Sequence, residues 1–572
     1  MIELTKLKQI EEDVDKLAKK THIFSLLRFC ICICAIISIV CLLCLDNFVL
    51  YLSLSLFFIL ALIGFAIGTN PIYYQLKLKK NLEYIYKRHE NRRNMSYQSF
   101  TSNGRELINY QDFKELDLDL LGTRSLYQYL CIAKSKAGKE KLAKQLTFPE
   151  HKNEAFKKCV YALAKEEGVF QLEASLQQMD KEAQECDQEE MMSIARKRIG
   201  IPWYAIVLCI LSYVALIITS ILLVLNGITP YYIIFFIPLN FIIVKKCLKS
   251  EVFAFPATRY ANLLGVYKRL AKDITSFPLE DPYFKDLQKI IQEQYTSLVK
   301  FCHIFEMLSY RKNILLSLLG NGLFYLDYIL SLRYNAFSRH LESIEECLDA
   351  FSEIELMLSL AVIGMDNEIY SIPILDSSFR IEEGYHPLVK NCVPNSLNFE
   401  EGIILTGSNM SGKTTFMRML GVNQILANAG GIVCAKSFHT QHLQVLTSLR
   451  ANDMLQEGIS TFYAEVNRMK KIMEESKTGK TLVLIDEIFK GTNAKDRIYA
   501  AQEIIKKLNS YGVYFLITTH DFELCETKNI LNYHFDEEYL ENKITFDYKL
   551  KPGKCQKTNA IYLLKLAGVL EN

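Results

Sequence analysis

The chain has 572 residues, a formal net charge of +2, and a composition that is 50% hydrophobic and 23% charged. This length allows about three or four domains that each bury a core of their own. The near-neutral charge gives no support for nucleic-acid binding, which normally needs a strongly basic face, although it does not exclude a local basic surface.

Two apolar runs near the N-terminus predict a transmembrane hairpin. Residues 29–45 and 48–67 carry no charge, and each is about long enough to cross a hydrocarbon core of ~30 Å as a helix. A cleaved signal peptide is disfavoured, because the second run follows after two residues and no small-x-small cleavage site intervenes. We therefore predict a cytosolic amphipathic leader (1–28) and a first transmembrane hairpin (29–70).

The cysteines do not point to a disulfide scaffold. Five of the sixteen lie inside the first apolar run, and the others are scattered along the chain, as in a reduced cytosolic protein. Cys41-x-x-Cys44 has a redox or metal-binding spacing. In an apolar helix, however, we interpret this pair as ordinary packing residues.

A cytosolic helical segment (71–199) and a second transmembrane hairpin (200–246) follow. The spacing of Leu126 and Leu130 is typical of helices, as is that of Leu142 and Leu146. In the hairpin, residues 203–225 are long enough to span. Residues 228–244 are shorter and contain two prolines, so a full span and a re-entrant segment both stay open.

Flanking charge predicts the orientation of both hairpins. The two connecting turns, Asp46-Asn47 and Asn226-Gly227, carry no base, whereas lysines and arginines flank the outer ends of all four runs. By the positive-inside rule, both termini are cytoplasmic, which predicts an integral membrane protein of a bacterial inner membrane. The same bases could also contact anionic lipid or DNA phosphates. They are Lys16, Lys19, Lys20, Arg28, Lys77, Lys79, Lys80, Arg88, Arg92, Arg93, Arg196, Lys197, Arg198, Lys245, Lys246 and Lys249.

The remainder of the chain divides into a helical core and lever segment (247–372) and a C-terminal α/β ATPase domain (373–572). Gly407 to Thr414 fits G-x-x-x-x-G-K-[ST], the phosphate-binding loop of nucleoside triphosphatases. An apolar run precedes this loop, and a helical stretch that stops at Gly430-Gly431 follows it. The expected cofactors are therefore ATP and Mg²⁺. The predicted nucleotide-binding residues of the loop are Gly407, Ser408, Asn409, Met410, Ser411, Gly412, Lys413, Thr414 and Thr415.

Two later apolar strands carry the other predicted catalytic groups. Residues 481–487 end in two acids, of which Asp486 would support Mg²⁺ together with Thr414, and Glu487 would polarise the attacking water. The strand 513–520 ends in His520. Alone, His520 would be an ordinary strand-end residue. Following the other two elements, it is expected to contact the γ-phosphate. The predicted catalytic residues are Lys413, Glu487 and His520.

These residues resemble a known family. The loop from Gly407 to Arg418, with its Asn409-Met410 pair, is similar to the nucleotide loop of the MutS DNA mismatch repair proteins. Further similar segments follow in family order. They are Gly384 to Val389 (a His-Pro motif), Ser460 to Glu465, Asp486 to Asn493, Thr519 to Leu524 and Asn559 to Val569, with weaker likeness at Leu120 to Arg124 and at Ala137-Gly138 through Phe148-Pro149.

The resemblance implies an ABC-type, MutS-like ATPase domain that follows an all-α core and works as a homodimer. In the family, the serine that corresponds to Ser460 reaches the nucleotide of the opposite subunit. The turn that corresponds to Gly491-Thr492 lies at the dimer interface. The expected partners are thus a second copy of the chain, the lipid bilayer and, without mismatch preference, DNA.

The departures from the family bear on mismatch recognition. Membrane sequence occupies the region where members carry a mismatch-reading domain with a Phe-x-Glu wedge, and residues 247–370 look too short for a long DNA clamp. We therefore expect a membrane-anchored, ATP-switched dimer that acts on DNA or a DNA-associated partner without true mismatch recognition.

Two alternatives remain. The first is a membrane scaffold or stress-response ATPase that has protein partners only. The second, an ABC-type transporter component, is disfavoured because the sequence has no Leu-Ser-Gly-Gly-Gln signature and no polar pathway residue in its charge-free spans.

Overall fold

The computed structural model describes residues 2–44, 47–108, 112–180, 188–226, 233–248, 257–337, 341–400, 402–408, 410–450, 461–489, 493–540 and 543–555. The chain forms two compact units and passes between them several times. Unit 1 comprises Met1–Glu90, Glu167–Pro278 and Ile291–Glu345, and unit 2 comprises Asn91–Glu166, Leu279–Ile290 and Glu346–Asn572. The ATPase motifs all belong to unit 2, whereas every apolar run predicted to enter a membrane belongs to unit 1.

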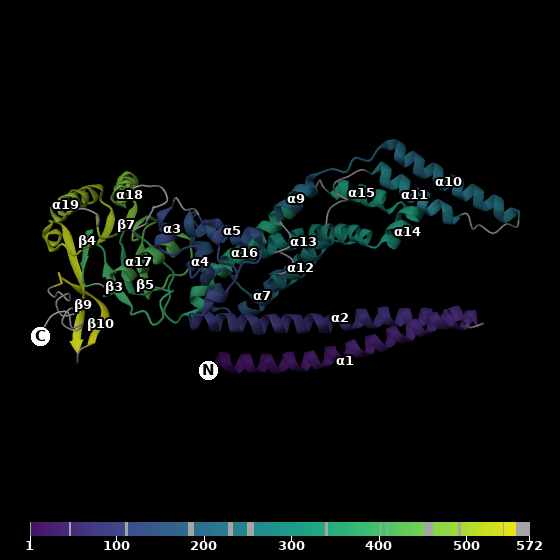
Figure 1. Ribbon diagram of the computed structural model, residues 1–572, viewed down its shortest axis with the longest axis horizontal. Coiled ribbons are helices and arrows are strands. Elements are labelled where there is room, and N and C mark those ends of the chain that lie inside the picture. The colour runs from purple at the N-terminus through teal and green to yellow at the C-terminus, as the bar shows by residue number, and fades with distance from the viewer. Residues whose placement is uncertain are drawn as a thin grey trace. The chain divides into compact units, whose positions relative to one another are not determined.

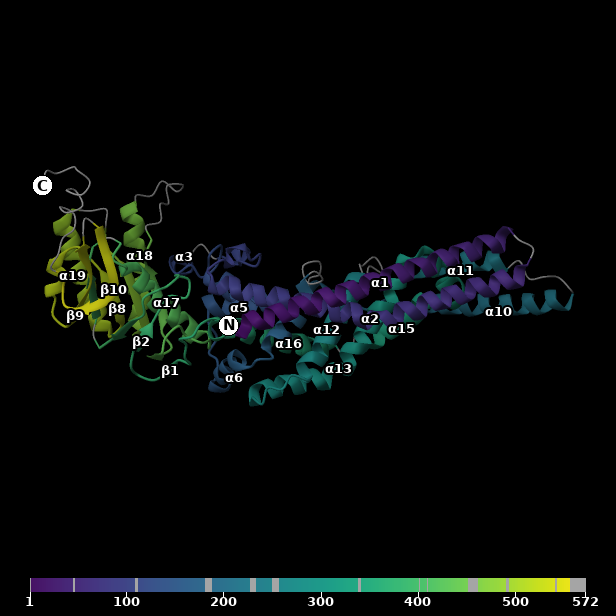
Figure 2. The same cartoon turned by 90° about the horizontal axis from the view of Figure 1, so that it is seen from below.

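Two long helices form the N-terminal part of unit 1. α1 (Ile2–Cys44) joins the predicted leader and the first apolar run in one helix, and α2 (Phe48–Arg93) continues beyond the second run. They lie side by side (Figures 1 and 2) and are antiparallel, since Ser25 pairs with Tyr73 at 2.9 Å and Ser55 donates to Ser38 at 3.1 Å. Ser38 and Ser55 are buried, while most large apolar side chains around them are exposed.

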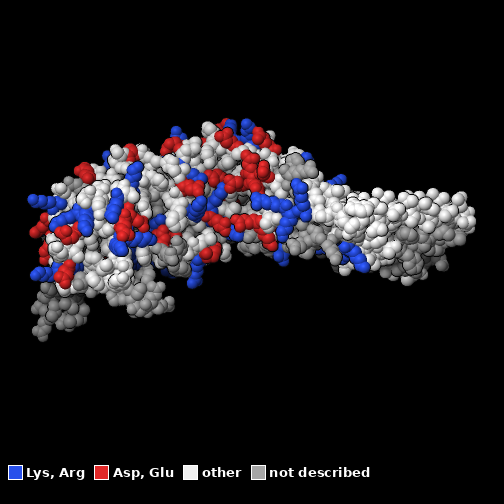
Figure 3. Space-filling view, turned by 90° about the horizontal axis from the view of Figure 1, so that it is seen from above, with Lys and Arg blue, Asp and Glu red and all other residues white. Residues whose placement is uncertain are grey.

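The other helices of unit 1 include an apolar pair. α10 contains no charged residue, and α11 contains only Lys245 and Lys246, next to its C-terminal end. Figure 3 shows the end that they form as a white surface, in contrast to the mixed charges elsewhere. The helices are α7 (Val169–Leu176), α9 (Gln188–Arg196), α10 (Trp203–Leu225), α11 (Ile233–Cys247), α12 (Ala257–Thr275), α14 (Ile314–Phe324) and α15 (Leu326–Phe337), with 3-10 turns η3 (Gln177–Met179) and η5 (Ser309–Lys312).

Two described helices are long and apolar enough to cross a membrane, over Lys6–Leu42 in α1 and Val49–Arg93 in α2. A third candidate arises if α14 and α15, which meet at 85°, are taken as one broken span. α10 is apolar over Ile206–Leu222, and α11 has only 15 residues. By length and composition, the first hairpin therefore agrees with its prediction, and the second hairpin stays a prediction.

Unit 2 begins with short helices. They are α3 (Phe113–Asp117), α4 (Leu126–Leu130), α5 (Lys136–Thr147) and α6 (Glu154–Lys165), preceded by η1 (Tyr97–Ser99) and η2 (Arg105–Leu107). Two longer helices are shared between the units: α13 (Pro282–Leu308) begins in unit 2 and ends in unit 1, and α16 (Leu341–Asp366) runs the opposite way.

One buried carboxylate fixes the start of α5. Glu355 of α16 accepts hydrogen bonds from the backbone amides of Lys134 at 2.8 Å and Ser135 at 3.0 Å, and its burial raises the pKa of the carboxyl. A Cβ on Gly138 would lie 2.1 Å from Glu355 Oε2, so this position requires glycine. This contact gives a structural reason for the Ala137-Gly138 motif.

The rest of unit 2 contains two sheets. The larger has the order β10-β9-β4-β8-β7-β6, with parallel pairing throughout except between β10 and β9. Its strands are β4 (Gly402–Thr406), β6 (Gln444–Ser448), β7 (Thr481–Asp486), β8 (Tyr514–Thr518), β9 (Ile530–Leu540) and β10 (Lys543–Pro552). The smaller, of order β1-β5-β2-β3, contains β1 (Ile374–Leu375), β2 (Arg380–Gly384), β3 (Asn395–Asn398) and β5 (Ser437–Thr440).

Helices cover both faces of the larger sheet. On β7, Val483 and Ile485 pack into a core with α18 (Thr461–Glu475) and α19 (Ala494–Tyr511). Leu484 faces the other way, toward Gly421 of α17 (Lys413–Asn428). Figures 1 and 2 show α17 and α19 on opposite sides of the strands. The prediction of a mixed α/β ATPase domain after a mostly helical region is confirmed. Short turns η8 (Ser476–Thr478) and η9 (Phe522–Glu526) complete the domain.

Candidate nucleotide-binding site

The phosphate-binding loop joins the C-terminal end of β4 to the N-terminus of α17. Gly407 has a φ of 145° and Gly412 a φ of 103°, which side-chain-bearing residues rarely adopt. A Cβ on Gly407 would also lie 2.9 Å from Ser411 Oγ and 3.0 Å from the backbone oxygen of Phe535. Lys413 is the first residue of α17, so the positive end of the helix dipole points at the loop.

Lys413 folds back into this loop. Its Nζ donates to the backbone oxygens of Gly407 and Ser408, both at 2.7 Å, and the residue is 7% exposed. Burial lowers the pKa of Lys413, while the nearby carboxylates of Asp486 and Glu487 oppose that shift. A phosphate in the loop would favour the protonated lysine, because an opposite charge stabilises the charged form.

The two acids that follow β7 lie beside the loop. Thr414 Oγ1 donates to Asp486 Oδ2 at 2.9 Å, and Thr518 Oγ1 donates to Asp486 Oδ1 at 2.5 Å. Thr518 Oγ1 also accepts a hydrogen bond from the backbone amide of Glu487 at 3.1 Å. The hydroxyl of Thr518 therefore links both acids, although the sequence analysis did not single it out. The run Thr518-Thr519-His520, which begins at the last residue of β8, is the sequence signal that could have identified Thr518.

His520 lies against Glu487. Its Nε2 is 3.2 Å from Glu487 Oε1, and its side chain is half-exposed. The next residue, Asp521, is held by two hydrogen bonds from Arg497 of α19, both at 2.7 Å. The structure thus brings His520 to the predicted water-orienting carboxylate, and α19 anchors the segment after β8.

A cavity of about 590 Å³ opens over the loop. Lys413, Thr414, Asp486 and Glu487 line it, together with residues that sequence reasoning missed. The missed residues are Gly384, Val389, Lys390, Asn391, Cys392, Val393, Asn395, Phe416, Met419, Phe535 and Tyr548. The His-Pro motif marks the start of this second wall, but its downstream residues carry no nucleotide-binding pattern of their own.

Hydrogen bonds within unit 2 hold the second wall in place. Asn395 Nδ2 donates to the backbone oxygen of Tyr548 at 2.9 Å, and Asn395 Oδ1 accepts from the amide of Leu550 at 2.8 Å. His386 is buried, and this burial lowers its pKa to about 3. Its Nδ1 accepts a hydrogen bond from the amide of Leu388 at 3.2 Å, which requires the neutral ring.

The donor set fits a nucleotide phosphate with its magnesium ion. The hydroxyl of Ser411 is buried inside the loop and has no hydrogen-bond partner among the described residues, so a phosphate oxygen could satisfy it. The part of the chain that is described has no group of three or more His, Cys, Asp or Glu side chains suited to a metal. Thr414 and Asp486 would therefore share Mg²⁺ with phosphate and water oxygens, as this ion prefers.

Some predicted site residues cannot be placed. Asn409, Ser460, the Gly491-Thr492 turn and the segment 559–569 lie outside the described residues. Met410 is 87% exposed at the mouth of the loop. The predicted contacts of Ser460 and of the turn with a partner subunit remain predictions.

Comparison with known proteins identifies the domain. Residues 403–572 match the family described as MutS domain V. This part of the chain is a MutS ATPase domain. MutS domain V is an ABC-type ATPase domain that uses ATP and Mg²⁺, so the predicted family and the predicted enzyme class are confirmed.

Similar curated proteins include three named DNA mismatch repair protein MutS. Identity is 32% over 248 residues for that of Aquifex pyrophilus, 31% over 244 for that of Natronomonas pharaonis and 31% over 272 for that of Clostridium kluyveri. The matched part covers 40% to 43% of this chain but only 28% to 31% of these relatives. The chain thus spans less than a third of their length, so the likeness describes the MutS ATPase domain and its surroundings.

Proposed function

We propose that this protein is a membrane-anchored ATPase that works as an ATP-switched homodimer. The observation that carries the proposal is that Lys413, Thr414, Asp486 and Glu487 line one cavity in a domain whose family hydrolyses ATP. Catalysis of this kind depends on positioning and on charge stabilisation around the γ-phosphate.

The reaction is ATP + H₂O → ADP + phosphate, and each site residue has a distinct role in it. Lys413 and the loop amides stabilise the negative charge of the phosphates. Thr414 and Asp486 would hold the magnesium ion, which would neutralise negative charge on the phosphates. Glu487 orients the attacking water, and His520, whose Nε2 lies 3.2 Å from Glu487 Oε1, positions that carboxylate and contacts the γ-phosphate. Tyr548 and the segment 389–395 form the cavity wall that would contact the adenine base of ATP.

The dimer follows from the family rather than from the described residues. MutS ATPase domains typically dimerise. In this chain, Ser460 and the Gly491-Thr492 turn would act across the interface, so that each nucleotide site is completed by the partner subunit.

The membrane anchor is supported by the surfaces of α1 and α2. Phe57 is 63% exposed and Ile67 is 67% exposed, whereas Ser38, Ser55 and Thr69 are buried between the helices. Apolar side chains pointing outward and polar ones inward suit a bilayer and not water. With the distribution of lysine and arginine, this arrangement supports a bacterial inner-membrane protein whose two termini are cytoplasmic, on the side where ATP is present.

DNA or a DNA-associated protein is the proposed partner of the switch. The supporting observation is that the similar curated proteins are named for DNA mismatch repair. Binding to DNA would depend on contacts with its phosphates. Such contacts require lysine and arginine side chains that are not already paired with carboxylates.

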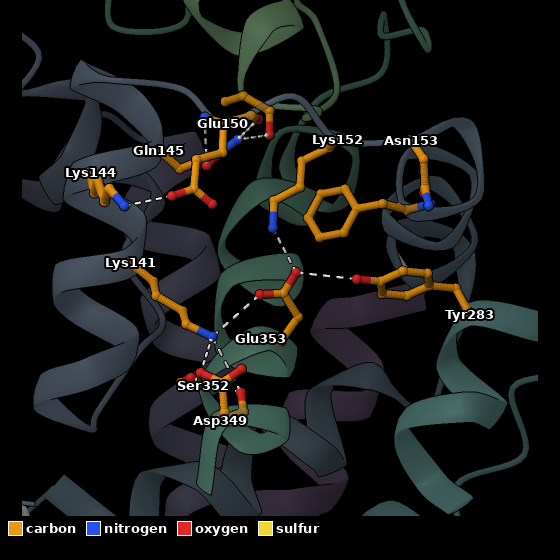
Figure 4. A network of polar contacts seen from close by, with 12 residues as sticks. Lys141, Lys144, Gln145, Glu150, Lys152, Asn153, Tyr283, Asp349, Ser352 and Glu353 are labelled. Carbon is orange, nitrogen blue, oxygen red and sulfur yellow. Dashed lines mark hydrogen bonds and ion pairs between the residues drawn. The ribbon is translucent and has the colours of Figure 1, made fainter. Parts of the chain in front are cut away.

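A switch that contacts proteins only is the second candidate, and the charge pairing in unit 2 favours it. Around a cavity of about 480 Å³, each of three lysines already pairs with a carboxylate (Figure 4). The pairs are Lys141–Asp349 at 2.6 Å, Lys144–Glu150 at 2.5 Å and Lys152–Glu353 at 2.7 Å. Lysines that are neutralised in this way gain little from a phosphate backbone.

The ATPase proposal is tested on the full-length protein in detergent. Lys413→Ala should weaken ATP binding about 10- to 100-fold, because it removes a charged donor from the phosphate loop. Glu487→Gln should bind ATP normally and lose about 100-fold or more in kcat, because only the water-orienting carboxylate changes. The control is Glu474→Gln, an exposed carboxylate on α18. Wild-type turnover in Glu487→Gln would rule out its role.

A salt series separates the two candidate partners. The full-length protein is titrated with labelled duplex DNA at several salt concentrations, with and without ATP. Affinity that falls steeply as salt rises indicates DNA-phosphate contacts. No binding near physiological salt in either nucleotide state would favour a switch that contacts proteins only.

A further inference from the structure

Helix α14 of unit 1 has its apolar and polar sides reversed relative to a helix of a soluble protein. Ile314, Leu315 and Phe324 are 82%, 63% and 63% exposed, whereas Ser317 and Asn321 are buried. The helix contains no charged residue. A soluble domain would turn these large side chains inward, since burying each one is worth about 1.5–3 kcal/mol. Their outward direction indicates an apolar surrounding.

The inner face of α14 packs against the predicted second hairpin through small and polar groups. A Cβ on Gly322 would lie 2.6 Å from the backbone oxygen of Ile237, so α14 and α11 approach backbone to backbone. Asn240 of α11 donates to the backbone oxygen of Gly322 at 3.0 Å, and Ser212 of α10 donates to Asn240 at 2.6 Å. The hydroxyl of Tyr213 donates to the backbone oxygen of Leu323. Close contact at glycine and interhelical hydrogen bonds are how helices associate in membranes.

Several polar groups at the bend between α14 and α15 are paired with one another. Tyr325 has a φ of 47°, and the two helices meet there at 85°. Asn321 Oδ1 accepts from the backbone amide of Asp327 at 2.9 Å, and Tyr310 donates to Asp327 Oδ1 at 2.6 Å. Arg311 lies 3.2 Å from Asp327 Oδ2. Irregular backbone is tolerated at membrane depth only where such partners are supplied by the protein.

Both connections of the pair lead to unit 2. α13, which leads into α14, begins in unit 2, and α16, which follows α15, ends in unit 2. Arg311 and Lys312 directly precede α14, as expected on the cytoplasmic side. At 1.5 Å per residue, the 11 residues of α14 extend about 16 Å, roughly half of a ~30 Å hydrocarbon core. Alone, α14 is thus too short to cross, and the 85° bend turns α15 away from its direction.

We propose that α14 and α15 form a re-entrant element whose exposed apolar face lies among lipid acyl chains beside α10 and α11. This inference rests on the membrane anchoring under the proposed function. It assigns to the bilayer a segment within 247–372, which the sequence predicts to be cytosolic. The occupant is lipid because α14 packs against α10 and α11 of the predicted second hairpin, and α10 also exposes large apolar side chains, with Ile210 and Leu211 58% and 59% exposed.

Site-specific photo-crosslinking in native membranes tests the proposal. A benzophenone side chain is placed at Leu316 or Phe324, which are 51% and 63% exposed, so the fold should tolerate it. Phe57 of α2 serves as the positive control and Tyr499 of α19, 68% exposed in unit 2, as the negative control. Phospholipid adducts identified by mass spectrometry should be as abundant at Leu316 and Phe324 as at Phe57, and at least about tenfold above those at Tyr499.

The outcomes separate this inference from the anchoring on which it rests. Adducts at Phe57 with none above background at Leu316 and Phe324 would overturn the re-entrant element and leave the anchor standing. Background levels at all four positions would overturn the anchor as well. Adducts to another protein, or to a second copy of this chain, in place of lipid would show that the face is a protein interface and would also overturn the proposal.

A second measurement distinguishes a re-entrant element from a span. His303→Cys in α13 and Glu342→Cys in α16 place exposed thiols before and after the pair. Both should react with a membrane-impermeant reagent in inverted vesicles and neither in sealed right-side-out cells, as read on their own peptides by mass spectrometry. Reaction of the two thiols from opposite sides would show that the segment crosses the membrane.

Discussion

Thr518 joins the two acids of the nucleotide site through one hydroxyl. It donates to Asp486 at 2.5 Å and accepts from the amide of Glu487 at 3.1 Å. Glu487 itself has a φ of 60°, a conformation that costs a non-glycine residue of order 1–3 kcal/mol and that its surroundings must impose. A single threonine therefore orients the carboxylate assigned to magnesium and the backbone of the one assigned to water.

Thr518→Val is the matching test, since it keeps the shape and removes the hydroxyl. The loss of a hydrogen bond to a charged group is worth about 1.5–3 kcal/mol, so kcat should fall about 10- to 100-fold. The Kd for ATP should change little, because Lys413 and the loop stay intact. Thr518→Ser, which restores the hydroxyl, should recover most of the activity. Equal loss in both variants would mean that packing, and not the hydroxyl, is responsible.

His386 makes the stability of the ATPase domain depend on pH. Burial lowers its pKa from 6.5 to about 3, so between these values the unfolded chain binds a proton that the folded chain does not. Stability is therefore fully present above about pH 6.5 and falls as the pH drops toward 3, by about 2 kcal/mol at pH 5.

His386→Asn should reduce the loss of stability at acidic pH. The amide oxygen of asparagine can accept the hydrogen bond from Leu388 but does not titrate. The measurement is the thermal midpoint of the full-length protein in detergent between about pH 8 and pH 5. The wild-type midpoint should fall more steeply than that of the variant. Parallel curves would show that other groups produce the loss of stability at acidic pH.

At the scale of elements, α3 ties three parts of the ATPase domain together. Asp117 accepts hydrogen bonds from the amides of Leu449 at 2.9 Å and Arg450 at 3.2 Å and pairs with Arg468 of α18. Asp119 binds Arg450 at 2.7 Å and Arg418 of α17 at 3.1 Å. Arg450 directly precedes the segment 451–460, which ends in Ser460, and Arg468 follows it in α18. Arg418 lies in α17, about one turn after the phosphate loop. The end of α3 thus contacts residues on both sides of the segment 451–460, whose Ser460 is predicted to reach the partner's nucleotide.

Asp117, the last residue of α3, and Asp119, two residues beyond it, should differ strongly on substitution. Asp117 and Arg468 are buried, so Asp117→Ala leaves an unpaired buried charge and should lower the free energy of unfolding by about 3–5 kcal/mol. Asp119 and Arg450 are partly exposed, so Asp119→Ala should cost only about 0–1 kcal/mol. The free energy of unfolding of both variants is measured by denaturant titration, and hydrogen exchange in α18 is measured as a second readout. Similar losses would contradict it.

The sequence predicted the elements whose signal is local and missed those made by long-range contacts. The loop 407–414 and the acids after β7 were predictable because a run of eight residues or a buried strand carries the whole pattern. The pairing of Asp117 with Arg468 joins residues 351 positions apart, and no local pattern reports it. α14 was hidden for another reason. Its apolar run is half the length of a span, so a search for spans passes over it.

At the scale of the whole molecule, helices long and apolar enough to cross a membrane and a MutS ATPase domain lie in one chain. In the N-terminal part of the described chain, α1 and α2 have apolar outward faces. Charged residues in unit 2 pair with one another around the cavity of Figure 4. Neither surface resembles one that reads bases. Any energy gained from DNA would therefore come from phosphate contacts, which carry no sequence information.

Mismatch preference should accordingly be absent. Discrimination requires an apolar wedge that unstacks a base step at a cost of a few kcal/mol, recovered only if the bent duplex gains further contacts. The exposed apolar side chains of α1 and α2 are assigned to lipid and cannot enter a duplex at the same time. The full-length protein should therefore bind a homoduplex and a duplex with one G·T mismatch equally in competition. A preference of about tenfold, roughly 1.4 kcal/mol, would reveal a recognition element elsewhere in the chain.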